Sequence, residues 1–145
     1  MKDAFAACDL RYLDLESLKT RFFNRPVLGI ALVNDGKSSL TFSYVSQFYS
    51  GDDLMIGNTG YLCVFERSFL PELLRKKVLQ LSMFALGKSS EYHLSVKDYE
   101  KTLRLFEKMT YEQNSSYQYK FDLIRTYLAQ IIHLVMKMDR SLRQR

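Results

Sequence analysis

The chain has 145 residues, of which 47% are hydrophobic and 26% are charged. This length and composition predict one globular domain with a sizeable core, and they exclude a chain that is mainly disordered. No apolar run approaches the roughly eighteen residues of a membrane span, and no signal-peptide core follows Met1. We therefore expect a cytoplasmic protein that does not have a membrane as its partner.

The formal charge of +5 is concentrated at one end, because residues 137–145 contribute +3 of it. The rest of the chain is close to neutral, and no predicted element combines a basic stripe with interleaved aromatic residues. Direct binding of this chain to a phosphate backbone is therefore weakly supported. Cys8 and Cys63 lack the spacing of metal ligands, which predicts two free thiols in a reducing compartment.

The first clear structural signal is a β-hairpin. Residues 10–25, which precede it, fit either an alternating strand pattern or a short helix, so both interpretations stay open. Residues 27–33 are apolar, and the Asp35-Gly36 dipeptide behind them is typical of a hairpin turn. The second strand alternates hydroxyl side chains with three larger ones, Leu40, Phe42 and Tyr44.

Two more strands are predicted at residues 54–56 and 61–65, after which the pattern changes to helix. Ser68 is a suitable N-cap, and Pro71 falls within a first helical turn, where its missing N–H costs little. These signals predict a short helix near residues 69–77.

Two longer helices are predicted over residues 95–145. Ser95 begins a sequence that resembles a capping box, and a polar break at residues 113–116 separates the two helices. We expect them to form an antiparallel hairpin for dimerisation, within the same domain as the β region of residues 1–94. Strands followed by helices indicate an α+β fold.

The last helix carries a heptad repeat of apolar residues, which is typical of helix-to-helix packing. This seam consists of Phe121, Ile124, Leu128, Ile131, Val135, Met138 and Leu142. A second row lies beside it and consists of Leu123, Tyr127 and Leu134, flanked by Ile132 and Met136. We expect one row to pack on the chain's own domain and the other to contact a second copy, with the seam as the candidate dimer interface.

No pattern typical of catalysis is found. The only histidines, His93 and His133, do not form a cluster of metal ligands. The Asp52-Asp53 pair is more typical of turn capping than of acid-base chemistry. We therefore expect a protein that is not an enzyme, with no catalytic residue, metal or cofactor.

The strand region is rich in aromatic residues that would line the interior of a barrel. The candidate ligand-binding residues are Phe42, Tyr44, Phe48, Tyr49, Tyr61 and Phe65. Aromatic walls with a few hydroxyl groups suit a sugar or another organic effector. The alternative is that these side chains fill a small, solid core.

The order of segments resembles the N-terminal regulatory domain of AraC-type transcription regulators. The motifs are residues 36–42 (GKSSLTF), 51–56 (GDDLMI) and 60–70 (GYLCVFERSFL), followed by Leu94-Ser95 at the start of the helical hairpin. The resemblance implies a small cupin-like antiparallel β-barrel, or partial barrel, that binds a small-molecule effector. It also implies a homodimer formed through the hairpin, and DNA binding only through a C-terminal helix-turn-helix part that this chain lacks.

Two other classes of function stay open. One is a small cupin-type binding protein or enzyme, with or without a metal, although the metal-binding histidines of enzymatic cupins have no counterpart in this sequence. Bound metal after purification would favour that class. The other is a ligand-free oligomerisation module, which a solid interior would favour.

Overall fold

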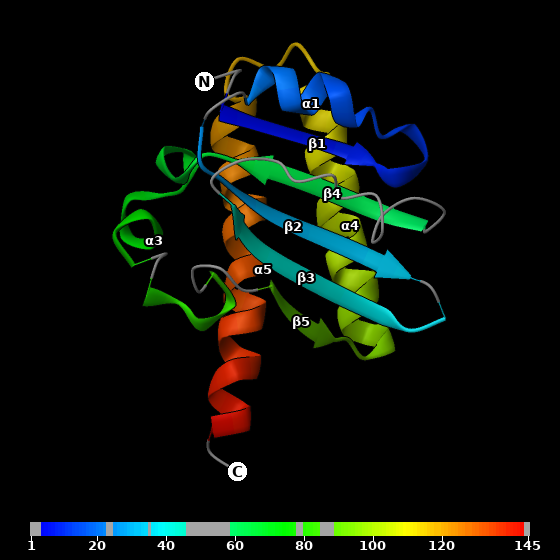
Figure 1. Cartoon of the computed structure of the whole chain (residues 1–145), viewed down its shortest axis with the longest axis vertical. Coiled ribbons are helices and arrows are strands. Elements are labelled where there is room, and N and C mark those ends of the chain that lie inside the picture. Colours follow the sequence, from blue (N-terminus) through cyan, green and yellow to red (C-terminus); the bar gives the residue numbers. More distant parts are fainter. Residues whose placement is uncertain are drawn as a thin grey trace.

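The strands that the structure describes form one antiparallel sheet (Figure 1). The structure is a computed structural model, and it describes residues 4–22, 25–34, 36–45, 59–77, 80–84 and 89–143. The strands are β1 (Phe5–Asp9), β2 (Val27–Asn34), β3 (Ser38–Val45), β4 (Thr59–Phe65) and β5 (Ser89–His93). Their order across the sheet is β1-β4-β2-β3-β5, so β1 and β5 form its edges.

The β2–β3 hairpin follows the sequence signals closely. Asn34 pairs with Ser38 next to the turn, and Val27 pairs with Val45 at the far end. The side-chain oxygen of Asn34 accepts a hydrogen bond from the N–H of Gly36 at 3.4 Å. The expected strand at residues 54–56 lies outside the described residues.

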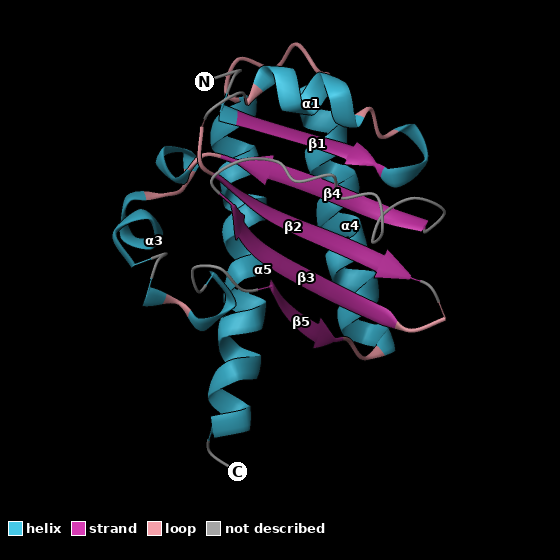
Figure 2. Cartoon of the chain, in the orientation of Figure 1, coloured by secondary structure: helices cyan, strands magenta, loops and turns pink. Residues whose placement is uncertain are grey.

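The helices divide between the two faces of the sheet (Figure 2). The α-helices are α1 (Leu15–Arg21), α3 (Glu72–Lys77), α4 (Val96–Gln113) and α5 (Lys120–Arg143). The short 3-10 helices are η2 (Leu10–Tyr12), η3 (Arg67–Phe69) and η5 (Ser82–Phe84). In the described part of the chain, none of these helices has the length and apolar character that crossing a membrane requires.

The two long helices run side by side in opposite directions along one face of the sheet (Figure 1). The side-chain oxygen of Ser95 caps α4 by accepting a hydrogen bond from the N–H of Asp98 at 3.1 Å. Near the same end of the pair, the Tyr92 hydroxyl donates to a carboxylate oxygen of Asp139 at 3.2 Å and ties β5 to α5. The helix pair therefore covers the sheet as far as its β5 edge.

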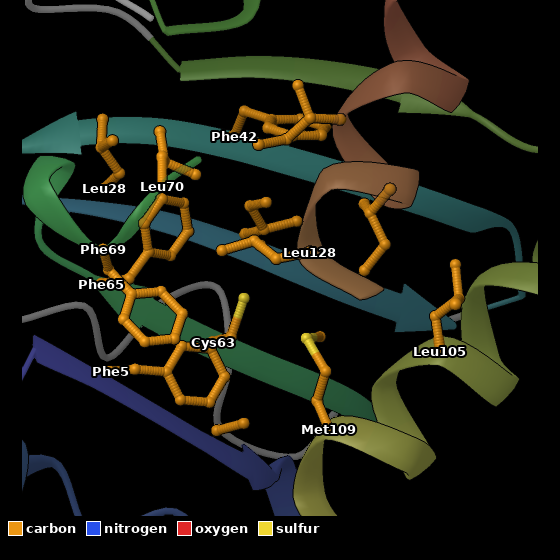
Figure 3. Close-up of a cluster of buried hydrophobic side chains, with 14 of the residues drawn as sticks. Phe5, Leu28, Phe42, Cys63, Phe65, Phe69, Leu70, Leu105, Met109 and Leu128 are labelled. Atoms are coloured by element: carbon orange, nitrogen blue, oxygen red, sulfur yellow. The ribbon is translucent and has the colours of Figure 1, made fainter. Parts of the chain in front are cut away.

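The main core lies between this helix pair and the sheet (Figure 3). Leu28, Ile30 and Leu32 of β2 point to this face because alternate strand residues share a side. Leu105 and Leu128 meet them from α4 and α5. The described strands thus have helices where the interior of a barrel would be.

The α+β class is confirmed, whereas the described strands do not close into the expected cupin-like barrel. The edges β1 and β5 are not paired with each other. The physical reason is the apolar face of the sheet, which is buried against α4 and α5 and needs no second wall of strands.

A second, smaller core lies on the opposite face, under α1. It contains Ala31 and Val33 of β2, Leu62 and Val64 of β4, and Phe22, the residue that follows α1 in the sequence. Asp14 caps α1, because its carboxylate accepts a hydrogen bond from the N–H of Ser17 at 3.1 Å. Residues 10–25, for which the sequence left two interpretations, therefore hold helical structure in η2 and α1.

Candidate functional site

The aromatic residues expected to bind an effector are largely built into the core. Phe42 and Phe65 are fully buried. The ring of Phe42 lies edge-on to Phe84 and Tyr92, with centroids 5.3 and 5.8 Å apart, and Phe65 contacts the same Phe84 at 6.4 Å. Because Phe84 of η5 contacts both rings, Phe42 and Phe65 belong to the packed core of the described residues, and their role in binding an effector stays a prediction.

The other expected ligand-binding residues give less information. Tyr61 is partly exposed and stacks on Phe106 of α4, with ring centroids 5.9 Å apart. Phe48, Tyr49 and the side chain of Tyr44 lie outside what the structure describes.

Most of the heptad seam of α5 packs in the chain's own core. Ile124, Leu128, Ile131 and Val135 are 0% exposed and belong to the main core. These four side chains therefore cannot contact a second copy in this fold, which corrects the candidate dimer interface. Phe121 and Met138, at the two ends of the seam, are partly exposed, and the side chain of Leu142 is not described.

The second row of α5 keeps accessible surface. Leu123, Tyr127 and Leu134 are all partly exposed. The Lys108 ammonium of α4 lies 5.6 Å from the centroid of the Tyr127 ring. A shallow hollow of about 360 Å³ between the two helices is lined by Tyr127 and by the exposed Tyr111.

A groove of about 650 Å³ runs along the β1 edge of the sheet. Its floor is the strand from Phe5 to Cys8. Leu18 and Arg21 of α1 form one wall, and the other wall comes from the end of α4 and the start of α5. Figure 1 shows β1 as the uppermost strand of the sheet, with α1 and the turn that joins α4 to α5 both above it.

Two side chains bind the backbone of β1 from within this groove. The side-chain oxygen of Gln113, the last residue of α4, accepts a hydrogen bond from the N–H of Ala7 at 3.0 Å, and its NH₂ group donates to the carbonyl of the same residue. Arg21 donates from Nη2 to the carbonyl of Phe5 at 2.7 Å. Phe5 and Ala7 therefore turn their backbone groups into the groove, away from β4.

The walls of the groove carry more positive than negative charge. Lys120 donates to the carbonyls of Ser115 and Gln113 at 2.9 and 3.3 Å, next to the C-terminal end of α4. Arg21 is the second cation, and Asp14 is the acidic residue of the lining. The charge of Lys120 is thus held by neutral carbonyl groups.

The thiol at the end of the groove is not a nucleophile at neutral pH. Burial, and to a smaller extent the neighbouring Asp9 carboxylate, raises the pKa of Cys8 to about 11. Hydrogen bonds from Arg11 in turn hold the pKa of Asp9 below its usual value. A protonated thiol reacts poorly, so we assign no chemistry to Cys8.

Among the side chains that the structure describes, no three of the types His, Cys, Asp and Glu lie close enough together to hold a metal ion. No pattern in the sequence indicates the groove, because its key residues have no distinctive spacing or chemistry. Gln113 lies in a polar break between two helices, and β1 is only five residues long.

No protein-family model matches the chain, and no curated protein is significantly similar to it. The fold and the two surfaces described above, the second row of α5 and the groove at β1, are therefore the basis for assigning a function.

Proposed function

We propose that this chain is a non-catalytic regulatory and dimerisation domain of a transcription regulator, of the AraC type that its segment order resembles. The proposal assigns dimerisation to the second row of α5 instead of the seam. It assigns no DNA binding to the described residues. It does not place an effector among the aromatic residues of the sheet, because Phe42 and Phe65 are enclosed.

The observation that carries the proposal is that α5 has a second apolar row that its own domain covers only in part, since Ile132 beside it is buried while Leu123, Tyr127 and Leu134 are partly exposed. The seam is fully buried from Ile124 to Val135, while Leu123 and Leu134 remain partly exposed. An apolar row at helical spacing that is left accessible is typical of a helix with a second partner.

The surroundings of this row favour a second copy as that partner. The hollow between α4 and α5 is lined by both signs of charge, with Arg104 and Lys108 beside Glu107 and Glu112. A surface with both signs can match itself across a two-fold axis, because each cation of one copy can meet an acid of the other.

Sedimentation velocity of the chain at tens of micromolar tests the proposal. We expect a dimer, and we expect Leu134→Lys to convert it into a monomer because a charge would enter an apolar interface. His133→Lys is the matched control, since His133 is exposed and neighbours Leu134 on the same helix. A monomeric wild-type chain, or a Leu134→Lys chain that stays dimeric, would refute the dimerisation half.

The enclosed aromatic core also favours a second candidate, a ligand-free oligomerisation module. The two candidates differ in their response to small molecules, because a ligand that binds the folded state raises its stability. A thermal-shift screen with sugars and small organic acids separates them. A ligand-dependent rise in Tm supports the regulatory domain, and an unchanged Tm across the panel supports the module.

A further inference from the structure

We infer that the groove along β1 binds an extended, acidic segment of a partner polypeptide, which pairs with β1 as an additional strand. This inference goes beyond the proposed dimerisation and uses a different surface. Leu134 lies 13 residues beyond Phe121 along α5, which corresponds to about 20 Å at the helical rise. The two surfaces can therefore be tested independently.

Alternate residues of β1 direct their backbone N–H and C=O groups toward β4 and toward the groove. Ala6 and Cys8 face β4 in the ladder, and the carbonyl of Ala4 accepts a hydrogen bond from the N–H of Glu66 at 2.9 Å. The intervening Phe5 and Ala7 offer their groups to the groove, as the contacts of Arg21 and Gln113 demonstrate. An edge strand with such groups is a template for a further strand.

The second argument is the chemistry of Gln113. Its side-chain amide presents one C=O and one N–H to the N–H and C=O of Ala7. A residue of an adjacent antiparallel strand offers the same pair of groups, its own N–H and C=O, to the residue opposite. Gln113 thus takes the place of a single residue of a paired strand, and a partner strand would replace it with a longer run of the same hydrogen bonds.

The third argument is the shape of the groove. The five residues of β1 correspond to about 17 Å of extended chain. The volume of about 650 Å³ lies within the range of ligand sites. Successive side chains of a bound strand would point in turn to the wall with Leu18 and to the wall with Phe121, so both walls offer apolar contacts.

The fourth argument is charge, which selects the class of segment. Arg21 and Lys120 stand on opposite walls, with Asp14 as the acid among the lining residues. Glutamate or aspartate side chains on the bound strand would meet one of these cations on each wall. A second copy of this chain is a poorer occupant, because its own walls and cations would meet those of the first copy.

Fluorescence anisotropy with a labelled peptide tests the inference. The probe is a valine heptapeptide with glutamate at positions 2 and 5, which point to opposite walls in an extended strand, and it is titrated with the whole chain. We expect saturable binding, and we expect binding to weaken at least about tenfold when lysine replaces glutamate. The same peptide with alternate backbone amides methylated should not bind, since it cannot pair with β1. No binding of the first peptide, or equal binding of all three, would overturn the inference.

The variant Ala7→Pro tests the same site from the side of the protein. It removes the N–H that donates to Gln113 and leaves the ladder to β4 in place, which is where an edge strand tolerates proline. We expect peptide binding to be lost while the circular dichroism spectrum stays unchanged. If Ala7→Pro fails to fold, the comparison of the three peptides on the wild-type chain still decides the question.

Sedimentation of Ala7→Pro identifies the occupant. The inference expects the oligomeric state of Ala7→Pro to equal that of the wild type. Conversion of a wild-type dimer into a monomer by Ala7→Pro would show that β1 pairs with a second copy, which overturns the proposed occupant. Leu134→Lys, which changes the other surface, should leave the affinity for the peptide unchanged, so the failure of one proposal does not imply failure of the other.

Discussion

Gly60 lies where β4 comes too close to β2 for any side chain. Its φ is +144°, a conformation that favours glycine, and an added Cβ would stand 1.8 Å from the carbonyl oxygen of Leu32. Because this obstacle is backbone, a rotamer change cannot remove it. The pairing of Val33 with Gly60 therefore depends on the absence of a side chain at this single position.

Gly60→Ala should destabilise the fold much more than Gly36→Ala. Gly36 also has a positive φ, of +104°, but an added Cβ meets no atom within 4 Å there. We expect backbone strain of about 1–3 kcal/mol for Gly36→Ala, and a larger loss for Gly60→Ala because the strands must also separate. Urea denaturation measures both changes. Equal losses for the two variants would contradict this account of Gly60.

The buried thiols predict a fold that weakens at alkaline pH. Burial raises the pKa of Cys63 well above its usual value, and burial with Asp9 raises that of Cys8 to about 11. An unfolded thiol ionises at about pH 8.5, so these groups favour the folded state fully below that pH. Their contribution is lost as the pH rises through the folded-state pKa.

We therefore expect the free energy of unfolding to fall between about pH 8 and about pH 11. Tyr61, whose pKa is also raised mainly by burial, acts in the same direction. The variant Cys63→Ala should show a smaller decrease over this range. A pH profile of Cys63→Ala that is parallel to that of the wild type would refute a role for this thiol.

At the scale of the element, α5 is a helix with a core side and a partly exposed side. The core side carries the seam, in which Ile124, Leu128, Ile131 and Val135 are completely enclosed. The second row carries Leu123 and Leu134, which keep contact with solvent. The same residue type at two positions on one helix therefore makes two different contributions to stability.

Leu128→Ala should cost about 2–5 kcal/mol, because it leaves a cavity in the main core. Leu134→Ala should cost under about 1 kcal/mol, as is usual for a partly exposed position. Chemical denaturation at a concentration below that of dimer formation measures both values. A larger loss for Leu134→Ala than for Leu128→Ala would mean that the two rows have been assigned to the wrong sides.

The elements also show what the sequence can and cannot predict. The capping residues and the polar break predicted two helices after residue 95, in agreement with α4 and α5. The spacing of the seam predicted an apolar stripe, but spacing does not say whether the chain itself or a second copy covers it. The structure places Ile124, Leu128, Ile131 and Val135 of the seam in the chain's own core, whereas dimerisation itself stays a prediction.

The edge strands and the groove could not be predicted from the sequence, because the strands are short and the contact that forms the groove joins distant residues. The strands β1 and β5 are five residues each, and their alternation is too short to stand out. Gln113 forms its hydrogen bonds with Ala7, which lies 106 positions earlier in the chain. Such a contact leaves no local pattern, so neither the strand nor the site that it forms could be read from neighbouring residues.

In the whole molecule, the sheet separates two cores of unequal size. The larger one lies under α4 and α5 and contains most of the enclosed aromatic side chains, and the smaller one lies under α1. The strands β2 and β4 have neighbours on both sides and contribute to both cores. They form the centre of the molecule, with β1 and β5 as its margins.

Hydrogen exchange should follow this arrangement. We expect the slowest amides in β2 and β4, because releasing them requires both cores to open. The amides of β5 should exchange faster, since this strand has a neighbour on one side in the described sheet. Mass spectrometry of peptides from the two regions gives the comparison. Equal protection of β5 and β2 would indicate that the margins and the centre open together.

The hydrogen bonds between Gln113 and Ala7 also have a consequence for folding during translation. β1 leaves the ribosome some fifty residues before its partner β4, and Ala7 leaves it 106 residues before Gln113. During translation, β1 therefore passes through a period in which it has formed neither its ladder to β4 nor its hydrogen bonds to Gln113. Unpaired strand edges of nascent chains can pair with other chains and promote aggregation. The emergence of α4 ends this period, so the rate of translation between β1 and α4 sets how long β1 stays without its native partners.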